Sequence, residues 1–199
     1  MDSRPGSINY CHQGGPLMRY ALLLRGINVG GKNKIVMSEL IRQVEELGYS
    51  RVTTYINSGN LFFNSDRPES DIIAGFKDFF ANLYPFVLTF TLLSAKDFAA
   101  EDLPDWWGDD LARKDVLFYT VDLDRELVQR AIEKLELADE IVHFGELGIY
   151  WGKYQEKTFL KTTYHKALLK QPFYKAVTIR NHKTYAKLAD YLELPQDCS

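Results

Sequence analysis

The amino-acid sequence predicts an α+β protein made of two ferredoxin-like repeats, each with the order strand–helix–strand–strand–helix–strand and each followed by an extra helix. Apolar, β-rich runs and helical periodicities occur in this order twice along the 199 residues. The dipeptide Pro85-Phe86 recurs 87 residues later as Pro172-Phe173. Ser94, a polar residue placed to cap a helix, is followed at the same spacing by Asn181. One spacing shared by two landmarks indicates an internal duplication.

The predicted domain boundaries place a leader or disordered arm at residues 1–17, the first repeat at 18–103, and the second repeat with a C-terminal helix at 104–199. Residues 1–17 show no hydrophobic period and are rich in Gly, Pro, Ser and Gln. Cys11 and Cys198 lie in opposite end segments, so we expect a cytoplasmic protein without a disulfide framework. No apolar run is long enough for a membrane-spanning helix.

Local patterns define the elements of the first repeat. Residues 20–25 form an apolar strand that ends in a Gly-rich loop. Ser38 is placed to cap the N-terminus of a helix, and Gly48 stands where that helix ends. Ser58-Gly59 between two β-rich runs predicts a tight hairpin, and Pro68 lies near the start of the next helix. The hairpin strands, the helix face and the closing strand are expected at 52–56, 60–63, 72–83 and 86–93.

The second repeat shows the same succession of patterns. Asp124 is placed to cap its first helix, Gly145 lies at its hairpin turn, and its second helix ends before Pro172. Its elements are expected at 116–121, 124–135, 140–144, 147–151, 158–170 and 176–180. Trp106-Trp107 in the connector is expected to fill the seam between the repeats. Four aromatic residues on the third strands are expected in the core, at the seam between the sheets, rather than as RNA-stacking platforms: Phe62, Phe63, Tyr150 and Trp151.

The first strand-to-helix connection is much longer in the first repeat than in the second. Two or three residues suffice in the second repeat, whereas the first repeat has residues 26–37, GINVGGKNKIVM. Its glycines permit positive φ and a close approach of the backbone to a ligand. Arg25, Lys32 and Lys34 add positive charge, and exposed backbone N–H groups beside cations form an anion-binding nest. Long loops in a compact fold are often functional.

Topology is expected to bring this loop beside the first hairpin. The first two strands of a split β-α-β unit are parallel, so the loop and the hairpin lie at the same edge of the sheet. We therefore predict a ligand site with Arg25 and Lys32 for charge and glycine N–H groups as donors. The residues of this site are Arg25, Gly26, Asn28, Gly30, Gly31, Lys32, Asn57, Ser58, Gly59 and Asn60, with Arg180 and Asn181 as secondary candidates. The alternative is structural, because a tight hairpin needs Asn, Ser and Gly in any case.

Charge is distributed unevenly although the formal net charge is only -3. Residues 96–146 carry 6 Lys+Arg against 15 Asp+Glu, whereas residues 150–190 carry 9 Lys+Arg against 2 Asp+Glu. Such a reversal can steer an anionic partner to one face of the molecule. The alternative is that the two regions attract each other within the protein.

Several kinds of site are not expected. The string from Gly26 to Lys32 fits a phosphate-loop pattern, but Asn33 occupies the Ser/Thr position and further residues precede the helix, so a nucleotide triphosphatase loop is not predicted. The four histidines show no metal-ligand spacing. The sequence identifies no cofactor and no catalytic residue.

Three stretches of the chain resemble the bacterial domain-of-unknown-function-1697 family: RGINVGGKNKIVMSEL, TYINSGNLFF and TIRN. The resemblance extends over residues 18–194 and is most specific in the first stretch. It implies a cytoplasmic bacterial protein built of two ferredoxin-like repeats. It implies no activity, so no catalytic residue can be assigned from it.

Three functions are compatible with these observations. The first is a binding module for a phosphate-bearing ligand, either a nucleotide or a nucleic-acid backbone, at the Gly-rich loop. The second is an enzyme that acts on a small anionic metabolite. The third is a structural or protein-interaction module that uses the acidic and basic regions as complementary surfaces.

Overall fold

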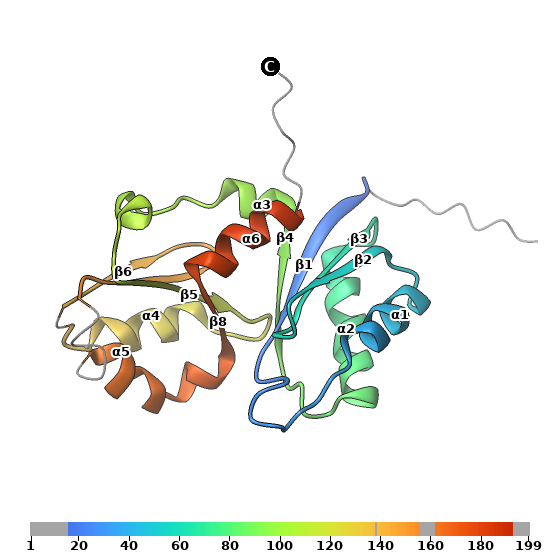
Figure 1. Ribbon diagram of the computed structural model, residues 1–199, viewed down its shortest axis with the longest axis horizontal. Helices are drawn as coiled ribbons and strands as arrows, with labels where there is room; N and C mark the ends of the chain where they lie inside the picture. The colour runs from blue at the N-terminus through green and yellow to red at the C-terminus, as the bar shows by residue number, and fades with distance from the viewer. Residues whose placement is uncertain (1–15, 138, 156–161, 193–199) are drawn as a thin grey trace, which may run out of the picture.

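The computed structural model describes residues 16–137, 139–155 and 162–192, which form an α+β structure with two four-stranded antiparallel sheets (Figure 1). Most of the predicted leader, as well as Cys11 and Cys198, lies outside the described residues. No helix in the described part of the chain is long and apolar enough to cross a membrane.

The first sheet has the strand order β2-β3-β1-β4. Strand β1 pairs antiparallel with both β3 and β4, and β2 pairs antiparallel with β3, so β1 and β2 run in the same direction. The elements are β1 Met18–Leu24, α1 Met37–Glu46, β2 Ser50–Tyr55, β3 Asn60–Ser65, α2 Glu69–Leu83, β4 Phe90–Ser94 and α3 Ala95–Ala100.

The second sheet repeats this arrangement with the strand order β6-β7-β5-β8. Strand β8 occupies the edge position in this sheet that β4 occupies in the first sheet, and β8 begins 87 residues after β4. The elements are the 3-10 helix η1 Asp105–Gly108, β5 Arg113–Tyr119, α4 Arg125–Glu133, β6 Glu140–Phe144, β7 Gly148–Lys153, α5 Thr163–Lys166, the 3-10 helices η3 Leu168–Lys170 and η4 Pro172–Ala176, β8 Val177–Asn181 and α6 His182–Leu192.

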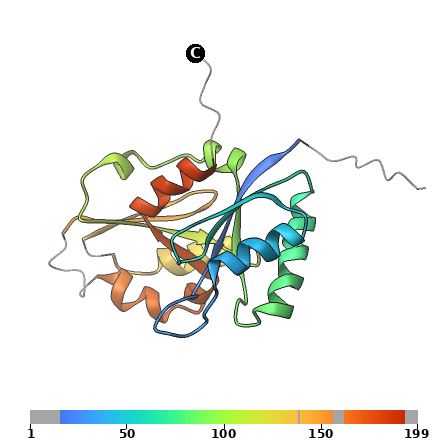
Figure 2. The ribbon, with the colours of Figure 1, turned by 45° about the vertical axis from the view of Figure 1, so that its right-hand side comes forward.

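Three hydrophobic clusters hold the sheets and helices together. Figures 1 and 2 show how the helices lie against the two sheets. Helices α1 and α2 cover the outer face of the first sheet, and α4 and α5 cover the outer face of the second. The central cluster joins the inner faces of the two sheets with Phe98 of α3 and Tyr185 of α6. Trp106 and Trp107 pack against this central cluster, which confirms their predicted place in the seam.

The predicted helix ends are mostly confirmed by hydrogen bonds. The side-chain oxygens of Ser94, Asp124 and Asn181 accept from backbone N–H groups of Asp97, Leu127 and Thr184, at 3.0, 3.1 and 2.9 Å. Each oxygen therefore caps the first turn of the helix that follows it. Gly48 follows the last residues of α1 with φ of +90°, as expected of a glycine at a helix C-terminus.

Ser38 does not cap α1, contrary to the sequence prediction. Helix α1 begins one residue earlier, and its N-cap is Val36, which provides no side-chain hydrogen bond. The backbone carbonyl of Val36 accepts from the N–H groups of Glu39 and Leu40. The prediction for Ser38 is wrong because the chain already enters the helix at Met37, directly after Val36.

Three other element boundaries differ from the sequence prediction. The strand expected at 86–93 begins only at Phe90, because the chain turns after Pro85 and leaves Leu88 87% exposed. The hairpin loop between β2 and β3 has four residues instead of two. In place of the helix expected at 158–170, the described part forms the short α5 and η3, and residues 156–161 lie outside the described residues.

The four aromatic residues of the third strands are buried, as predicted, but they do not all face the seam. Phe62 and Tyr150 belong to the central cluster between the sheets. Phe63 and Trp151 belong to the two outer clusters. Successive side chains of a strand point to opposite faces, so adjacent aromatic residues cannot share one layer.

Candidate functional site

The Gly-rich connection between β1 and α1 folds into a small hairpin of its own. Val29 and Lys32 form an isolated antiparallel bridge, and Gly30 and Gly31 at its tip have φ of +59° and +75°. Two consecutive positive φ angles produce a tight reversal that glycine adopts most readily. A Cβ added at either glycine would meet no atom within 4 Å. The backbone conformation therefore favours glycine here, and the tip remains uncovered.

Two asparagines hold this loop in shape. The side chain of Asn28 accepts from the Ile35 N–H at 2.8 Å and donates to the carbonyls of Ile35 and Asn57, both at 3.0 Å. Asn33 donates from its side chain to the carbonyl of Gly26 at 3.0 Å. The amide of Asn28 thus closes the loop and ties it to the β2–β3 hairpin, as the parallel course of β1 and β2 predicts.

A groove of about 500 Å³ lies beside this loop. Its charged lining residues are Lys32 and Lys34, both exposed, and Val36 and Met37 at the start of α1 also line it. The first N–H groups of a helix carry partial positive charge, and no side chain caps those of α1. The groove therefore combines two ammonium groups with a helix N-terminus. Its lining residues are Asn28, Gly31, Lys32, Lys34, Ile35, Val36, Met37 and Asn57.

The β2–β3 hairpin contributes both exposed and buried members of the predicted site. Asn57 and Ser58 are exposed, whereas Gly59 and Asn60 are buried. The side-chain amide of Asn60 donates to the Tyr55 carbonyl and to the Ser58 hydroxyl oxygen, both at 3.1 Å. Asn57 lines the groove, and Asn60 lies beneath the hairpin.

Arg180 reaches from β8 to this hairpin. Its Nε donates to Oδ1 of Asn60 at 2.6 Å, and its Nη2 donates to the carbonyls of Leu24, Ser58 and Gly59 at 2.8, 3.1 and 3.3 Å. The side chain is buried, and all of these acceptors are neutral. Burial and the neighbouring charge of Arg25 lower the pKa of Arg180 to about 10.

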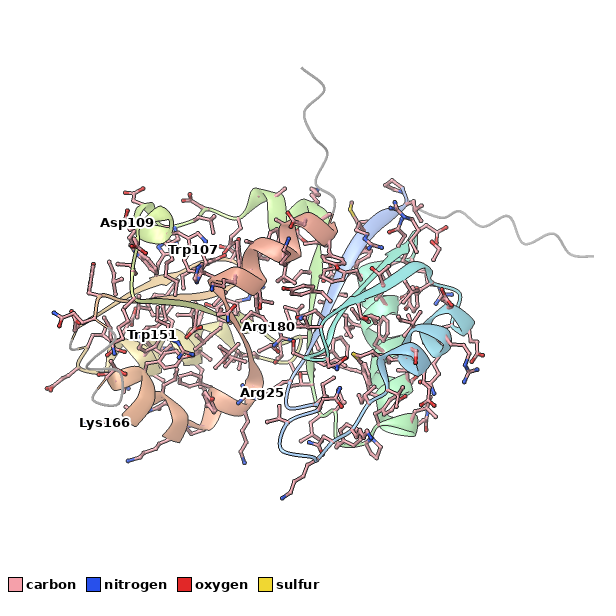
Figure 3. The ribbon with its side chains drawn as sticks, in the orientation of Figure 1. Arg25, Trp107, Asp109, Trp151, Lys166 and Arg180 are labelled. Atoms are coloured by element: carbon pink, nitrogen blue, oxygen red, sulfur yellow. The ribbon has the colours of Figure 1, made fainter. Side chains whose placement is uncertain are left out.

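Arg25 crosses the same boundary in the opposite direction (Figure 3). It follows β1, and its Nη1 donates to the Val177 carbonyl at 2.5 Å. Its guanidinium carbon lies 4.4 Å from the ring centroid of Tyr174. Arg25 is half-buried and is directed toward the second sheet.

The structure thus divides the predicted residues into two groups. Asn28, Gly31, Lys32 and Asn57 line the groove, whereas Arg25 and Arg180 meet at the boundary between the sheets. Asn181 belongs to neither group, because its side chain caps α6. No group of three or more His, Cys, Asp or Glu residues suited to a metal ion occurs among the described residues.

Tyr174 and Val177 could not be recognised from the sequence as partners of Arg25. Both lie about 150 residues further along the chain, near the start of the closing strand expected at 176–180. Lys34 was recognised as a cation, but its place in the groove could not be assigned. The sequence offers no signal for these contacts, because they depend on how the two sheets pack.

Comparisons with known proteins agree with this architecture. A solved structure, that of the conserved bacterial protein SP0830 from Streptococcus pneumoniae, is 54% identical and superposes with a TM-score of 0.87. The match covers 88% of this chain and 99% of that protein. No curated protein matches the sequence significantly. The model of the DUF1697 family, described as proteins of unknown function, matches residues 17–150, and the chain therefore belongs to this family.

Proposed function

We propose that the protein binds a phosphate-bearing ligand, a nucleotide or a nucleic-acid backbone, in the groove beside the Gly-rich loop. The observation that carries this proposal is the combination of Lys32, Lys34 and the uncapped N-terminus of α1 around one groove. Helix N-termini and flexible ammonium groups both favour phosphate oxygens. No carboxylate lines the described part of this groove.

The loop conformation supports the same proposal. Asn28 fixes the loop internally, so its own side chain serves the scaffold. The tip glycines leave their surroundings open, and the exposed side chain of Asn57 stands at the rim. A phosphate group in the groove would accept hydrogen bonds from Lys32 and Lys34, and Asn57 would orient the rest of the ligand.

A thermal-shift screen of nucleotides and phosphorylated metabolites tests the proposal, because a ligand that binds only the folded state raises the melting temperature. A compound that stabilises the wild type should lose its effect in Lys32→Ala. Lys96→Ala, which removes an exposed lysine of α3, provides the control and should respond as the wild type does. A shift that survives unchanged in Lys32→Ala contradicts binding in the groove.

The two classes of phosphate ligand differ in their salt dependence. Binding to a nucleic-acid backbone releases counterions, so its affinity falls steeply as salt increases. Fluorescence anisotropy with a labelled oligonucleotide at increasing salt measures this slope. A flat dependence, together with stabilisation by a mononucleotide, would assign the groove to small nucleotides.

We also propose that the two sheets are ferredoxin-like repeats that arose by duplication. The equal strand orders and the 87-residue offset between β4 and β8 support this relationship. The repeats would divide at residues 103–104, and the enlarged loop would be an addition to the first repeat. Separate expression of 18–103 and 104–199 tests this division, since each repeat should retain its own sheet by circular dichroism.

A cytoplasmic location, inferred from the terminal positions of the cysteines, is testable by cell fractionation.

A further inference from the structure

The boundary between β4 and β8 brings together the guanidinium groups of Arg25 and Arg180. Arg25 and Arg180 lie close enough for the charge of Arg25 to lower the pKa of Arg180, and neither forms an ion pair with a carboxylate among the described residues. Two guanidinium groups at a largely buried boundary without a counter-charge are electrostatically unfavourable.

Arg25 has N–H groups that are not used by the contacts described above. Its Nη1 is used by the Val177 carbonyl, but within residues 16–137, 139–155 and 162–192 its Nε and Nη2 form no hydrogen bond or ion pair. The ring of Tyr174 stacks against one face of the guanidinium. A guanidinium edge is the geometry that binds an oxyanion through two parallel hydrogen bonds.

Three buried hydroxyl groups flank the same boundary. The Oγ1 atoms of Thr89, Thr91 and Thr178 have no hydrogen-bond partner, and Thr91 and Thr178 are 1% and 0% exposed. Thr91 shares its side of β4 with Leu93 of the central cluster, and Thr178 shares its side of β8 with Arg180. Thr91 is also paired with Leu23, two residues before Arg25.

Backbone contacts confirm that these strand ends converge. Strands β4 and β8 contact each other, and the Val121 N–H donates to the Phe90 carbonyl at 3.0 Å. The hydroxyl of Thr120 donates to the Ala176 carbonyl at 2.7 Å. Arg25 donates to the carbonyl of Val177, the residue before Thr178, and Thr91 follows Phe90 in β4, so these residues lie at the converging strand ends.

We propose that this boundary, defined by Arg25, Arg180, Thr91 and Thr178 and called the seam site here, binds a small oxyanion such as inorganic phosphate or a carboxylate. An oxyanion accepts hydrogen bonds from both guanidinium and hydroxyl groups, and it supplies the missing negative charge. Water would satisfy the hydroxyls but would leave the two positive charges uncompensated. The seam site is separate from the Gly-rich groove and does not depend on the function proposed for that groove.

Isothermal titration with inorganic phosphate, at constant ionic strength, tests this inference. The double variant Lys32→Ala/Lys34→Ala removes the cations of the groove and should still bind phosphate. In that background, Arg25→Gln should weaken binding about tenfold or more, because it removes a charge-assisted donor pair. Arg42→Gln removes an exposed arginine that pairs with Glu46 on α1 and should leave the affinity unchanged.

Thr178→Val supplies a second, structurally mild variant. It should fold with undiminished stability in phosphate-free buffer, because the lost hydroxyl has no partner there. Its phosphate affinity should nevertheless fall several-fold. A parallel titration with acetate distinguishes a site for carboxylates from one selective for phosphate.

Two results would overturn the seam site. The first is that the groove double variant no longer binds either anion, which would place all binding at Lys32 and Lys34. The second is that Thr178→Val binds phosphate as tightly as its parent, whatever the effect of Arg25→Gln, because the anion would then lie at the surface and not at the boundary between β4 and β8.

Discussion

Arg180 and Asn60 are both buried and are joined by a hydrogen bond of 2.6 Å, although 120 residues separate them in the chain. Arg180 lies in β8 of the second sheet, and Asn60 is the first residue of β3 in the first sheet. The same guanidinium binds the carbonyls that end β1 and the hairpin, so one side chain fixes the second sheet to the edge that carries the Gly-rich loop.

We expect Asn60→Ala to destabilise the protein by about 2 kcal/mol, because it removes the acceptor of a buried charged donor. The free energy of unfolding from urea titration measures the effect. Asn57→Ala in the same hairpin is the control and should change stability little, since Asn57 is exposed. Equal stability of the two variants would show that Arg180 is satisfied without Asn60.

The contact between Arg180 and Asn60 illustrates what the sequence could and could not predict. Periodicity located the strands, the helices and the enlarged loop, because these patterns are local. Strand direction then correctly predicted that the loop and the hairpin lie together, as the bond from Asn28 to the Asn57 carbonyl shows. The packing of one sheet on the other is not encoded by any local period, so the partners of Arg25 and Arg180 could not be predicted.

The cap of α1 shows a different limit. Ser38 has the right chemistry for an N-cap, but a cap also requires a backbone that is still extended at that residue. Val36 has this extended conformation, with φ of -80° and ψ of 113°, and the helix is already under way at Ser38. A loop with several left-handed residues directs the chain in a way that residue preference does not reveal.

Gly59 should tolerate substitution less well than Gly31, although both have positive φ. A Cβ at Gly59 would lie 2.7 Å from Cβ of Leu24, whereas one at Gly31 would meet nothing within 4 Å. Gly31→Ala is therefore expected to cost about 1 kcal/mol, from the left-handed conformation alone. Gly59→Ala should cost more, because the buried hairpin must also move. Urea titration of both variants checks the order, and the reverse order would contradict the packing described here.

Glu101 makes the stability of the protein depend on pH. Burial raises the pKa of its carboxyl, although hydrogen bonds from the Leu147 N–H and the Tyr150 hydroxyl oppose this effect. The folded protein then binds the Glu101 proton more tightly than the unfolded chain does. Glu101 therefore stabilises the fold below its ordinary pKa, and this contribution is lost as the pH rises through the higher pKa of the folded state.

Glu101→Gln tests this dependence. Stability of the wild type relative to the variant should decrease as the pH rises across the acidic range, because only the wild type must ionise a half-buried carboxyl. Urea titrations of both proteins at a series of pH values measure the difference. Glu146→Gln, which changes an exposed neighbour, is the control and should show a weaker dependence. An increase in the stability of the wild type relative to Glu101→Gln as the pH rises would contradict a raised pKa for Glu101.

Ile56 is a β-branched residue in the left-handed region, with φ of +50°, and its side chain is 54% exposed. This conformation is costly for isoleucine, whereas asparagine adopts it more readily. We expect Ile56→Asn to stabilise the protein by about 1 kcal/mol, since strain is relieved and little burial is lost. Val29→Asn, at an exposed position without positive φ, should give no such gain. Urea titration measures both effects.

Because strained residues often accompany binding sites, Ile56→Asn should also be titrated with any ligand found for the groove beside the Gly-rich loop. A gain in stability with a loss of affinity would show that the strain at Ile56 serves binding, and a loss of stability would contradict the strain itself.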